Sequence, residues 1–198
     1  MGSRELKKAA TRTALVDAAA RLFAQRGVDA TTMDDIARAA GTSRTSVFNY
    51  FGYKEMILCE IGARYVAEIA GTAQAARGRR RSPRSLLLDL ADTLAVIAAR
   101  DPEVVSAVAR EMTHPDTARR RQASDTMGYG AVVNTALDAL EDAGQLKDRR
   151  LRASYTRMIL DMAAGALVRV GGDFPMDRLR TELHRNVDVF LDGATTSR

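Results

Sequence analysis

The sequence predicts an all-α protein in which a small helix-turn-helix unit precedes a larger helical domain. Apolar residues recur at helical spacing along most of the chain. Alanine, leucine, valine and arginine are abundant and aromatic residues make up only 5%, which favours helices over strands. Two short amphipathic segments joined by a glycine turn lie within residues 32–54. We therefore divide the chain into an N-terminal domain, residues 1–54, and a C-terminal domain, residues 55–198.

The composition limits the classes of protein to which the chain can belong. The chain has 198 residues, of which 46% are hydrophobic, enough for a small domain attached to a larger one. A formal net charge of +5 favours polyanion partners. Cys59 is the only cysteine, which excludes an intrachain disulfide and fits a reducing compartment. No apolar run has the length of a membrane span and no signal-peptide core is present, so we expect a cytoplasmic protein without a membrane partner.

The chain opens on a polar, basic segment. Residues 1–11, with Arg4, Lys7 and Lys8, predict a mobile arm. Two interpretations stay open: a solvated tail, or an arm that adds phosphate contacts beside the helix-turn-helix. Helical periodicity then predicts the first helix over Thr11–Arg26.

Residues 32–54 carry the helix-turn-helix pattern. Thr32 is a good N-cap, with Asp35 at the capping-box position. Gly41 suits the left-handed backbone that ends a helix, and Thr42 or Ser43 can cap the next helix.

The second helix of this pattern has two distinct faces. A period of 3.6 residues places Val47 and Phe51 on one side, where we expect burial, and Thr45 and Asn49 on the other. The outward set is small and polar. Such a surface suits a helix that enters the major groove of DNA and contacts base edges.

At these positions the chain resembles the DNA-binding domain of TetR-type transcriptional regulators. The residues that carry the match are Thr32, Ile36-Ala37, Ala40-Gly41-Thr42-Ser43, Val47-Phe48, Phe51 and Lys54-Glu55. The match covers roughly the first third of the chain. Phe48 stands where the family usually has tyrosine, and Tyr50 where it often has histidine. Phe48 lacks the hydroxyl that bonds a phosphate but can touch a thymine methyl or a sugar.

The resemblance implies which residues contact DNA. Phosphate contacts are expected from Thr32, Tyr50, Lys54 and the basic arm, and sequence preference from side chains on the second helix. The complete expected set is Thr32, Ser43, Arg44, Thr45, Ser46, Phe48, Asn49, Tyr50 and Lys54.

The remaining chain continues the helical period. We expect helices over residues 53–77, 83–101, 102–114, 116–143, 148–170 and 176–191, with a bend near Gly128 and Gly130. The first of them links the two domains. Residues 77–85 form a basic loop, for which solvation far from DNA is favoured over a second DNA contact.

The resemblance places a dimer contact on the last two helices. Their apolar stripes are compatible with half of a symmetric four-helix interface. The alternative is that both stripes face the core of their own subunit. The expected interface set is Met158, Ile159, Ala166, Leu183, Val187 and Phe190.

A small-molecule cavity is expected in the larger domain. Methionine and amphipathic residues on its helices suit an adaptable apolar site, although methionine fills ordinary cores as well. The candidate effector-binding residues are Ile61, Tyr65, Met112, Met127, Tyr129 and Met162.

Catalytic motifs are absent from the sequence. There is no HExxH, no phosphate-binding glycine loop followed by Gly-Lys-Ser/Thr, and no GxSxG, and His114 and His184 are too few for a metal cluster. We therefore predict no enzyme activity, no catalytic or metal-ligating residues and no cofactor. The leading hypothesis is a homodimeric repressor, released from a palindromic operator in double-stranded DNA by a moderately hydrophobic small-molecule effector. The alternatives are an architectural DNA-binding protein without an effector, and a helical small-molecule-binding protein or enzyme.

Overall fold

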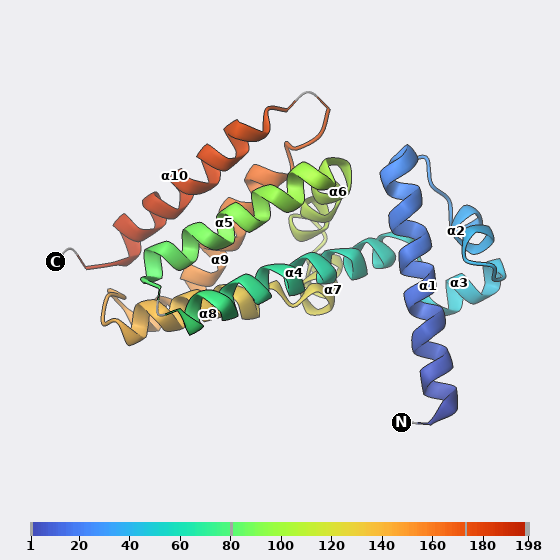
Figure 1. Ribbon diagram of the computed structural model, residues 1–198, viewed down its shortest axis with the longest axis horizontal. Coiled ribbons are helices and arrows are strands. Elements are labelled where there is room, and N and C mark those ends of the chain that lie inside the picture. The colour runs from blue at the N-terminus through green and yellow to red at the C-terminus, as the bar shows by residue number, and fades with distance from the viewer. Residues whose placement is uncertain (1, 80, 173, 197–198) are drawn as a thin grey trace.

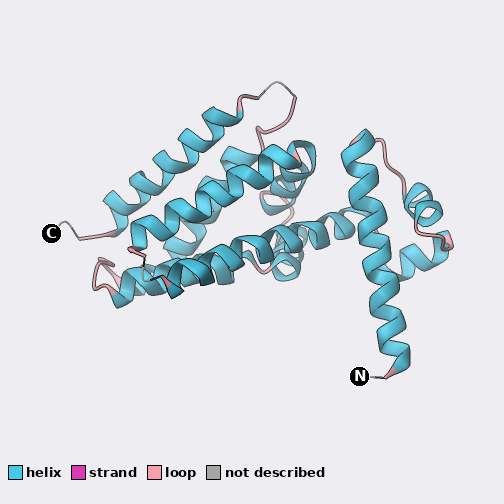
Figure 2. Cartoon of the chain, viewed as in Figure 1, coloured by secondary structure: helices cyan, strands magenta, loops and turns pink. Residues whose placement is uncertain are grey.

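The protein folds into helices. The computed structural model describes residues 2–79, 81–172 and 174–196, and these residues contain no strand beyond one isolated bridge between Leu146 and Thr195 (Figures 1 and 2). The N-terminal helices are α1 (Ser3–Arg26), α2 (Met33–Ala39) and α3 (Arg44–Phe51). The larger domain comprises α4 (Lys54–Gly78), α5 (Pro83–Arg100), α6 (Pro102–Met112), α7 (Thr117–Met127), α8 (Tyr129–Asp142), η1 (Arg149–Leu151), α9 (Arg152–Leu167) and α10 (Met176–Ala194). The predicted all-α class is confirmed.

The start of α1 corrects one expectation. The predicted mobile arm is helical from Ser3 onward, so α1 is longer than the predicted helix, and only Met1 of the arm lies outside the described residues. Arginine, glutamate, leucine, lysine and alanine are strong helix formers, and these residues fill this segment. The Glu5 carboxylate also accepts a hydrogen bond from the Gly2 amide at 3.1 Å, which closes the first turn.

A glycine divides the region predicted as one bent helix. Gly128 has a φ of +69° in the left-handed region, where α7 ends, and α8 begins at Tyr129. The break lets α7 turn away from α8 and lie against α4.

One core runs from the N-terminal domain into the larger domain. Leu15, Ile36 and Val47 are fully buried together with Ile57 at the start of α4, and the same cluster continues to Met127 on α7. Two further clusters hold α4, α5, α6, α8, α9 and α10 together. Because this core is shared and closely packed, a shift of α4 or α7 changes the packing of the helix-turn-helix.

The basic loop lies far from the helix-turn-helix. Figure 1 shows the connection between α4 and α5 at the opposite end of α4 from α3. The 25 residues of α4 span about 37 Å. In this loop region Arg81 pairs with Asp89 and Arg84 with Asp188, while Arg80 lies outside the described residues. This position favours the solvated loop over a second DNA contact.

Candidate nucleic-acid interface and effector cavity

The turn between α2 and α3 is fixed by side-chain caps. Thr32 accepts a hydrogen bond from the Asp35 amide at 3.2 Å, and the Asp35 carboxylate accepts one from the Thr32 amide at 3.1 Å. Gly41 has a φ of +65°, and Ser43 caps α3 by accepting from the Ser46 amide at 3.1 Å. Hydrogen bonds from Thr32 lower the pKa of the Asp35 carboxyl. The predicted capping box and turn are therefore confirmed.

The two faces of α3 are as the helical period predicts. Val47 is 0% exposed and Phe51 5%. Thr45, Phe48 and Asn49 are exposed on the other side. Phe48 is 39% exposed, so an aromatic ring lies on the outer surface of α3.

Some predicted DNA contacts have partners within the protein. Arg44 forms an ion pair with Asp34 of α2 at 3.0 Å, and its guanidinium lies 5.4 Å from the centre of the Phe48 ring. The Ser43 and Ser46 hydroxyls are 2.9 Å apart in the cap of α3. The Ser43 and Ser46 hydroxyls therefore belong to the N-terminal cap of α3.

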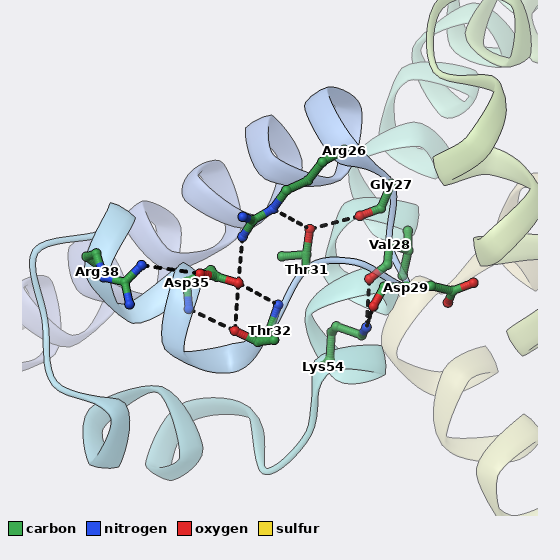
Figure 3. A network of polar contacts seen from close by, with 9 residues as sticks. All are labelled: Arg26, Gly27, Val28, Asp29, Thr31, Thr32, Asp35, Arg38 and Lys54. Atoms are coloured by element: carbon green, nitrogen blue, oxygen red, sulfur yellow. Dashed lines mark hydrogen bonds and ion pairs between the residues drawn. The ribbon is translucent and has the colours of Figure 1, made fainter.

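Lys54 anchors the loop between α1 and α2. Its ammonium donates to the Val28 carbonyl at 2.6 Å and is 3.5 Å from the Asp29 carbonyl (Figure 3). In the same network Thr31 donates to the Gly27 carbonyl at 2.8 Å. An ammonium has three donors, so one remains for a phosphate. Sequence reasoning gave Lys54 only the DNA role and missed this local one.

Arg12 is a positioning residue that sequence reasoning missed. From α1 it donates to the Tyr50 carbonyl at 3.3 Å, lies 4.5 Å from the centre of the Phe51 ring, and pairs with Glu60 of α4 at 2.5 Å. It therefore joins α1, α3 and α4. Tyr50 itself is half-buried against the core. No motif marks Arg12, because its partners come from distant parts of the chain.

The N-terminal turns of α1 project beyond the helix-turn-helix body (Figure 1). Arg4, Lys7 and Lys8 all lie in this exposed segment. Since the segment is helical, its charges are held at defined spacing rather than on a random coil.

A cavity of about 170 Å³ lies within the larger domain. Its walls come from α4, α5, α6, α7, α8, α9 and α10, and the lining contains no charged residue. Of the predicted effector residues, the structure brings together Tyr65, Met112, Met127, Tyr129 and Met162. The full lining is Gly62, Tyr65, Val66, Ile69, Leu87, Leu90, Ala91, Leu94, Ile97, Val105, Val108, Met112, Met127, Tyr129, Val132, Val133, Ala136, Ile159, Leu160, Met162, Ala163, Leu167, Leu183, Asn186, Val187 and Phe190.

The sixth predicted effector residue, Ile61, is placed elsewhere. Its side chain is 3% exposed and lies in the core shared with the N-terminal domain, beside a separate pocket that also contacts Ala20 of α1. The four-residue spacing that grouped Ile61 with Tyr65 did not reveal which flank of α4 faces the cavity. Ile61 is therefore corrected from a cavity residue to a core residue.

A close contact joins α4 to α7 at the cavity wall. A Cβ atom at Gly62 would lie 2.7 Å from the Met127 sulfur and 3.0 Å from a Val108 methyl. A larger residue at position 62 would therefore require the Met127 side chain to shift. Met127 is 3% exposed and lines the cavity as well, so one side chain belongs both to the cavity wall and to the α4–α7 contact.

The other end of α7 is bonded to the first turn of α4. Arg119 makes two hydrogen bonds of 2.7 Å to Glu111, whose residue is 6% exposed, and lies 3.7 Å from Glu55. Gln122 accepts a hydrogen bond from the Tyr53 hydroxyl at 2.8 Å. Because Tyr53 follows α3 closely in sequence, α7 connects the cavity to the C-terminal end of α3. Sequence reasoning identified no part of this network.

The expected dimer stripes face inward. Ala166 is 1% exposed, Leu183 4% and Phe190 2%, so these side chains pack inside their own subunit. Ile159 and Val187 line the cavity. Of the predicted set only Met158 is exposed, at 37%. The sequence pattern identified buried faces correctly but assigned them to a partner instead of the subunit core.

The remaining candidates have structural roles. Burial raises the pKa of the Cys59 thiol to about 12, which opposes thiolate chemistry. His114 accepts from the Asp116 amide at 3.1 Å, and His184 lies 2.6 Å from an Asp92 oxygen. Among the described residues, no group of His, Cys, Asp or Glu is placed to hold a metal ion. No described helix is both long and apolar enough to traverse a bilayer.

Family models match almost the whole chain. The model described as bacterial regulatory proteins, tetR family, matches residues 15–61, and the model of the C-terminal domain of TetR/AcrR family transcriptional repressors matches residues 63–193. The transcriptional repressor KstR2 of Rhodococcus jostii is 30% identical over 94% of this chain and 92% of its own length.

Solved structures agree with these matches. The TetR-family repressor FadR of Thermus thermophilus, in complex with lauroyl-CoA, has a TM-score of 0.84 and 28% identity, covering 94% of this chain and 96% of that chain. FadR of Bacillus subtilis, in complex with stearoyl-CoA, shares the fold with a TM-score of 0.64 at 16% identity, over 91% of this chain and 95% of that chain. The chain therefore belongs to the TetR family of bacterial transcriptional regulators, which bind DNA.

Proposed function

We propose that the chain is a homodimeric repressor that binds a palindromic operator and is released by an acyl-CoA. The observation that carries the effector class is the cavity wall, which is apolar and has no charged residue along its length. A fatty acyl chain is the kind of ligand that such a wall accommodates. The lauroyl-CoA complex of the Thermus thermophilus relative, at 28% identity, supports this choice.

On DNA, each α3 helix would enter one major groove. Thr45 and Asn49 are exposed there with small polar side chains suited to base edges, and Phe48 can touch a thymine methyl. Thr32, Tyr50 and Lys54 remain the proposed phosphate contacts. Two subunits related by a two-fold axis would place their helices about 34–36 Å apart, or a multiple of this distance.

The dimer surface is proposed on the outer side of α9 and α10. Met158 on α9 is 37% exposed and Val189 on α10 is 55% exposed, and both are large apolar side chains without cover in the subunit. Burial of such groups is a usual source of dimer affinity.

Release would proceed through α7. A ligand that displaces Met127 alters the tight contact with Gly62, and the Gln122 and Arg119 contacts carry the change to the first turn of α4. The ligand must bind the released state more tightly than the DNA-bound state for this to occur. A displaced Met127 side chain would supply this difference in affinity between the two states.

The decisive experiment selects DNA from a random pool with the purified protein. We expect a two-fold-symmetric consensus, and we expect lauroyl-CoA to release the protein from it in a gel-shift assay. A non-specific architectural protein would recover no consensus. A consensus that lauroyl-CoA leaves bound would refute the proposed effector class while leaving the DNA function in place.

A further inference from the structure

Three polar side chains line the cavity, those of Tyr65, Tyr129 and Asn186. Asn186 is the one that is not aromatic, and its hydrogen bond within the protein is long. It lies on α10, within one turn of Leu183 and Val187, which also line the cavity. Apart from Asn186 and the two tyrosines, the lining consists of apolar side chains and glycine. The Tyr65 hydroxyl already donates to Asp101 at 3.2 Å, and burial raises its pKa.

The Asn186 amide has hydrogen-bonding capacity to spare. Its nitrogen donates to the Met162 carbonyl at 3.4 Å, which is long for an N–H···O bond. A carboxamide carries two N–H donors and a carbonyl acceptor. Asn186 is half-buried in the cavity lining, so this remaining capacity lies beside apolar side chains and is available to a polar group of a ligand.

We propose that Asn186 forms a hydrogen bond with an uncharged carbonyl oxygen of the effector, such as the carbonyl oxygen of a thioester or an ester. This inference rests on the proposed acyl-CoA function and names the residue that recognises the head of the acyl chain. An N–H of the amide donates to the ligand carbonyl, and the amide oxygen stays free for a water molecule.

The same geometry excludes a free carboxylate at this position. No lysine, arginine or histidine lines the cavity to compensate a buried negative charge. Moving a carboxylate into such surroundings is far more costly than moving a neutral carbonyl. The cavity therefore distinguishes an acyl thioester from the corresponding free fatty acid.

The test compares two ligands that differ at one atom. Lauroyl-CoA carries the thioester carbonyl, and S-dodecyl-CoA is the thioether that lacks its oxygen. Calorimetric titration of the full-length protein is expected to show about fivefold to tenfold tighter binding of lauroyl-CoA, the range of one neutral hydrogen bond. In Asn186→Leu the two affinities should become equal, while free laurate should bind the natural protein more weakly than lauroyl-CoA.

A matched variant separates recognition from packing. Val187→Ala removes an adjacent lining side chain and should weaken both CoA ligands alike, so that their ratio is kept. Thermal unfolding of each variant checks the fold. If the natural protein binds both ligands equally, or if Asn186→Leu keeps their ratio, Asn186 is not the anchor although the effector class stands. If neither ligand binds the natural protein, the proposed effector class fails and the inference fails with it.

Discussion

In the proposed function, Thr45 and Asn49 are the side chains of α3 that would contact base edges. The Ser43 and Ser46 hydroxyls are paired in the helix cap, whereas Asn49 is exposed on the face of α3 away from the buried Val47. We expect Asn49→Ala to lower the preference for operator over scrambled DNA by about 1–3 kcal/mol, as one lost base contact does. Fluorescence anisotropy with both DNAs measures this. Ser46→Ala should change the preference less, and the reverse order would contradict the assignment.

Lys54 has a role in the fold and a proposed role on DNA. Loss of its bonds to the Val28 and Asp29 carbonyls should lower the free energy of unfolding of Lys54→Ala by about 1–3 kcal/mol. Loss of a phosphate contact should reduce the slope of log affinity against log salt by about one. Thermal unfolding and salt titration measure these separately. An unchanged slope would assign Lys54 to the fold alone.

At the scale of elements, α7 is the proposed connection between ligand and DNA. Removal of the Tyr53–Gln122 hydrogen bond in Gln122→Ala should leave the separate affinities for lauroyl-CoA and for operator within about threefold. The reduction of operator affinity by the ligand, typically about 1–3 kcal/mol in such systems, should shrink. Gel shifts with and without ligand give this coupling.

Two comparisons sharpen the α7 test. Tyr53→Phe removes the same hydrogen bond from the other side, so the double variant should behave like either single variant. Gln74→Ala changes an exposed residue of α4 outside this network and should leave the coupling intact. Equal loss of coupling in Gln74→Ala would argue against a specific path.

Because α1 is helical from Ser3 onward, the basic side chains of its first turns have defined positions relative to one another. We expect the double variant Lys7→Gln, Lys8→Gln to weaken binding to all DNA sequences and to lower the salt slope by about two, because two phosphate contacts are lost. Arg79→Gln removes a charge from the far end of α4 and serves as the control. A similar change per charge in the control would show that only net charge matters.

Local elements were predictable from sequence because their causes are local. Thr32, Asp35 and Gly41 act within a few residues of one another, and the sequence predicts the role of each. For the cap of α3 the sequence allows Thr42 or Ser43, and the structure shows Ser43. The charge density of residues 1–11 predicts a mobile arm, but the same residues favour helix and α1 begins at Ser3.

Sites assembled from distant segments were only partly predictable. Periodicity shows that Leu183 and Phe190 are buried but not what buries them, so a core face was assigned to a partner. The predicted methionines and tyrosines supply five of the residues that line the cavity, while Asn186 has no distinguishing pattern in sequence. Arg12 and Gln122 act across 38 and 69 residues of chain, beyond any local rule.

At the scale of the whole molecule, assembly should depend on the outer surface of α9 and α10. Sedimentation equilibrium is expected to give a dimer, and Met158→Asp should dissociate it and weaken operator binding while keeping lauroyl-CoA affinity. Val96→Asp changes another exposed aliphatic residue, on α5, and should remain dimeric. If Val96→Asp dissociates the dimer and Met158→Asp does not, the interface lies on α5 and the proposed surface is wrong.

The apolar cavity also bears on how long each copy of the regulator survives. An acyl chain bound in the cavity of about 170 Å³ would add packing contacts with its apolar walls. Ligand that saturates a site one-hundredfold above its dissociation constant adds about 2.7 kcal/mol to stability. Empty copies would therefore open more often and meet cellular proteases sooner. A bacterium starved of the inducer would turn over its repressor faster, and would need steady synthesis to keep the operator occupied.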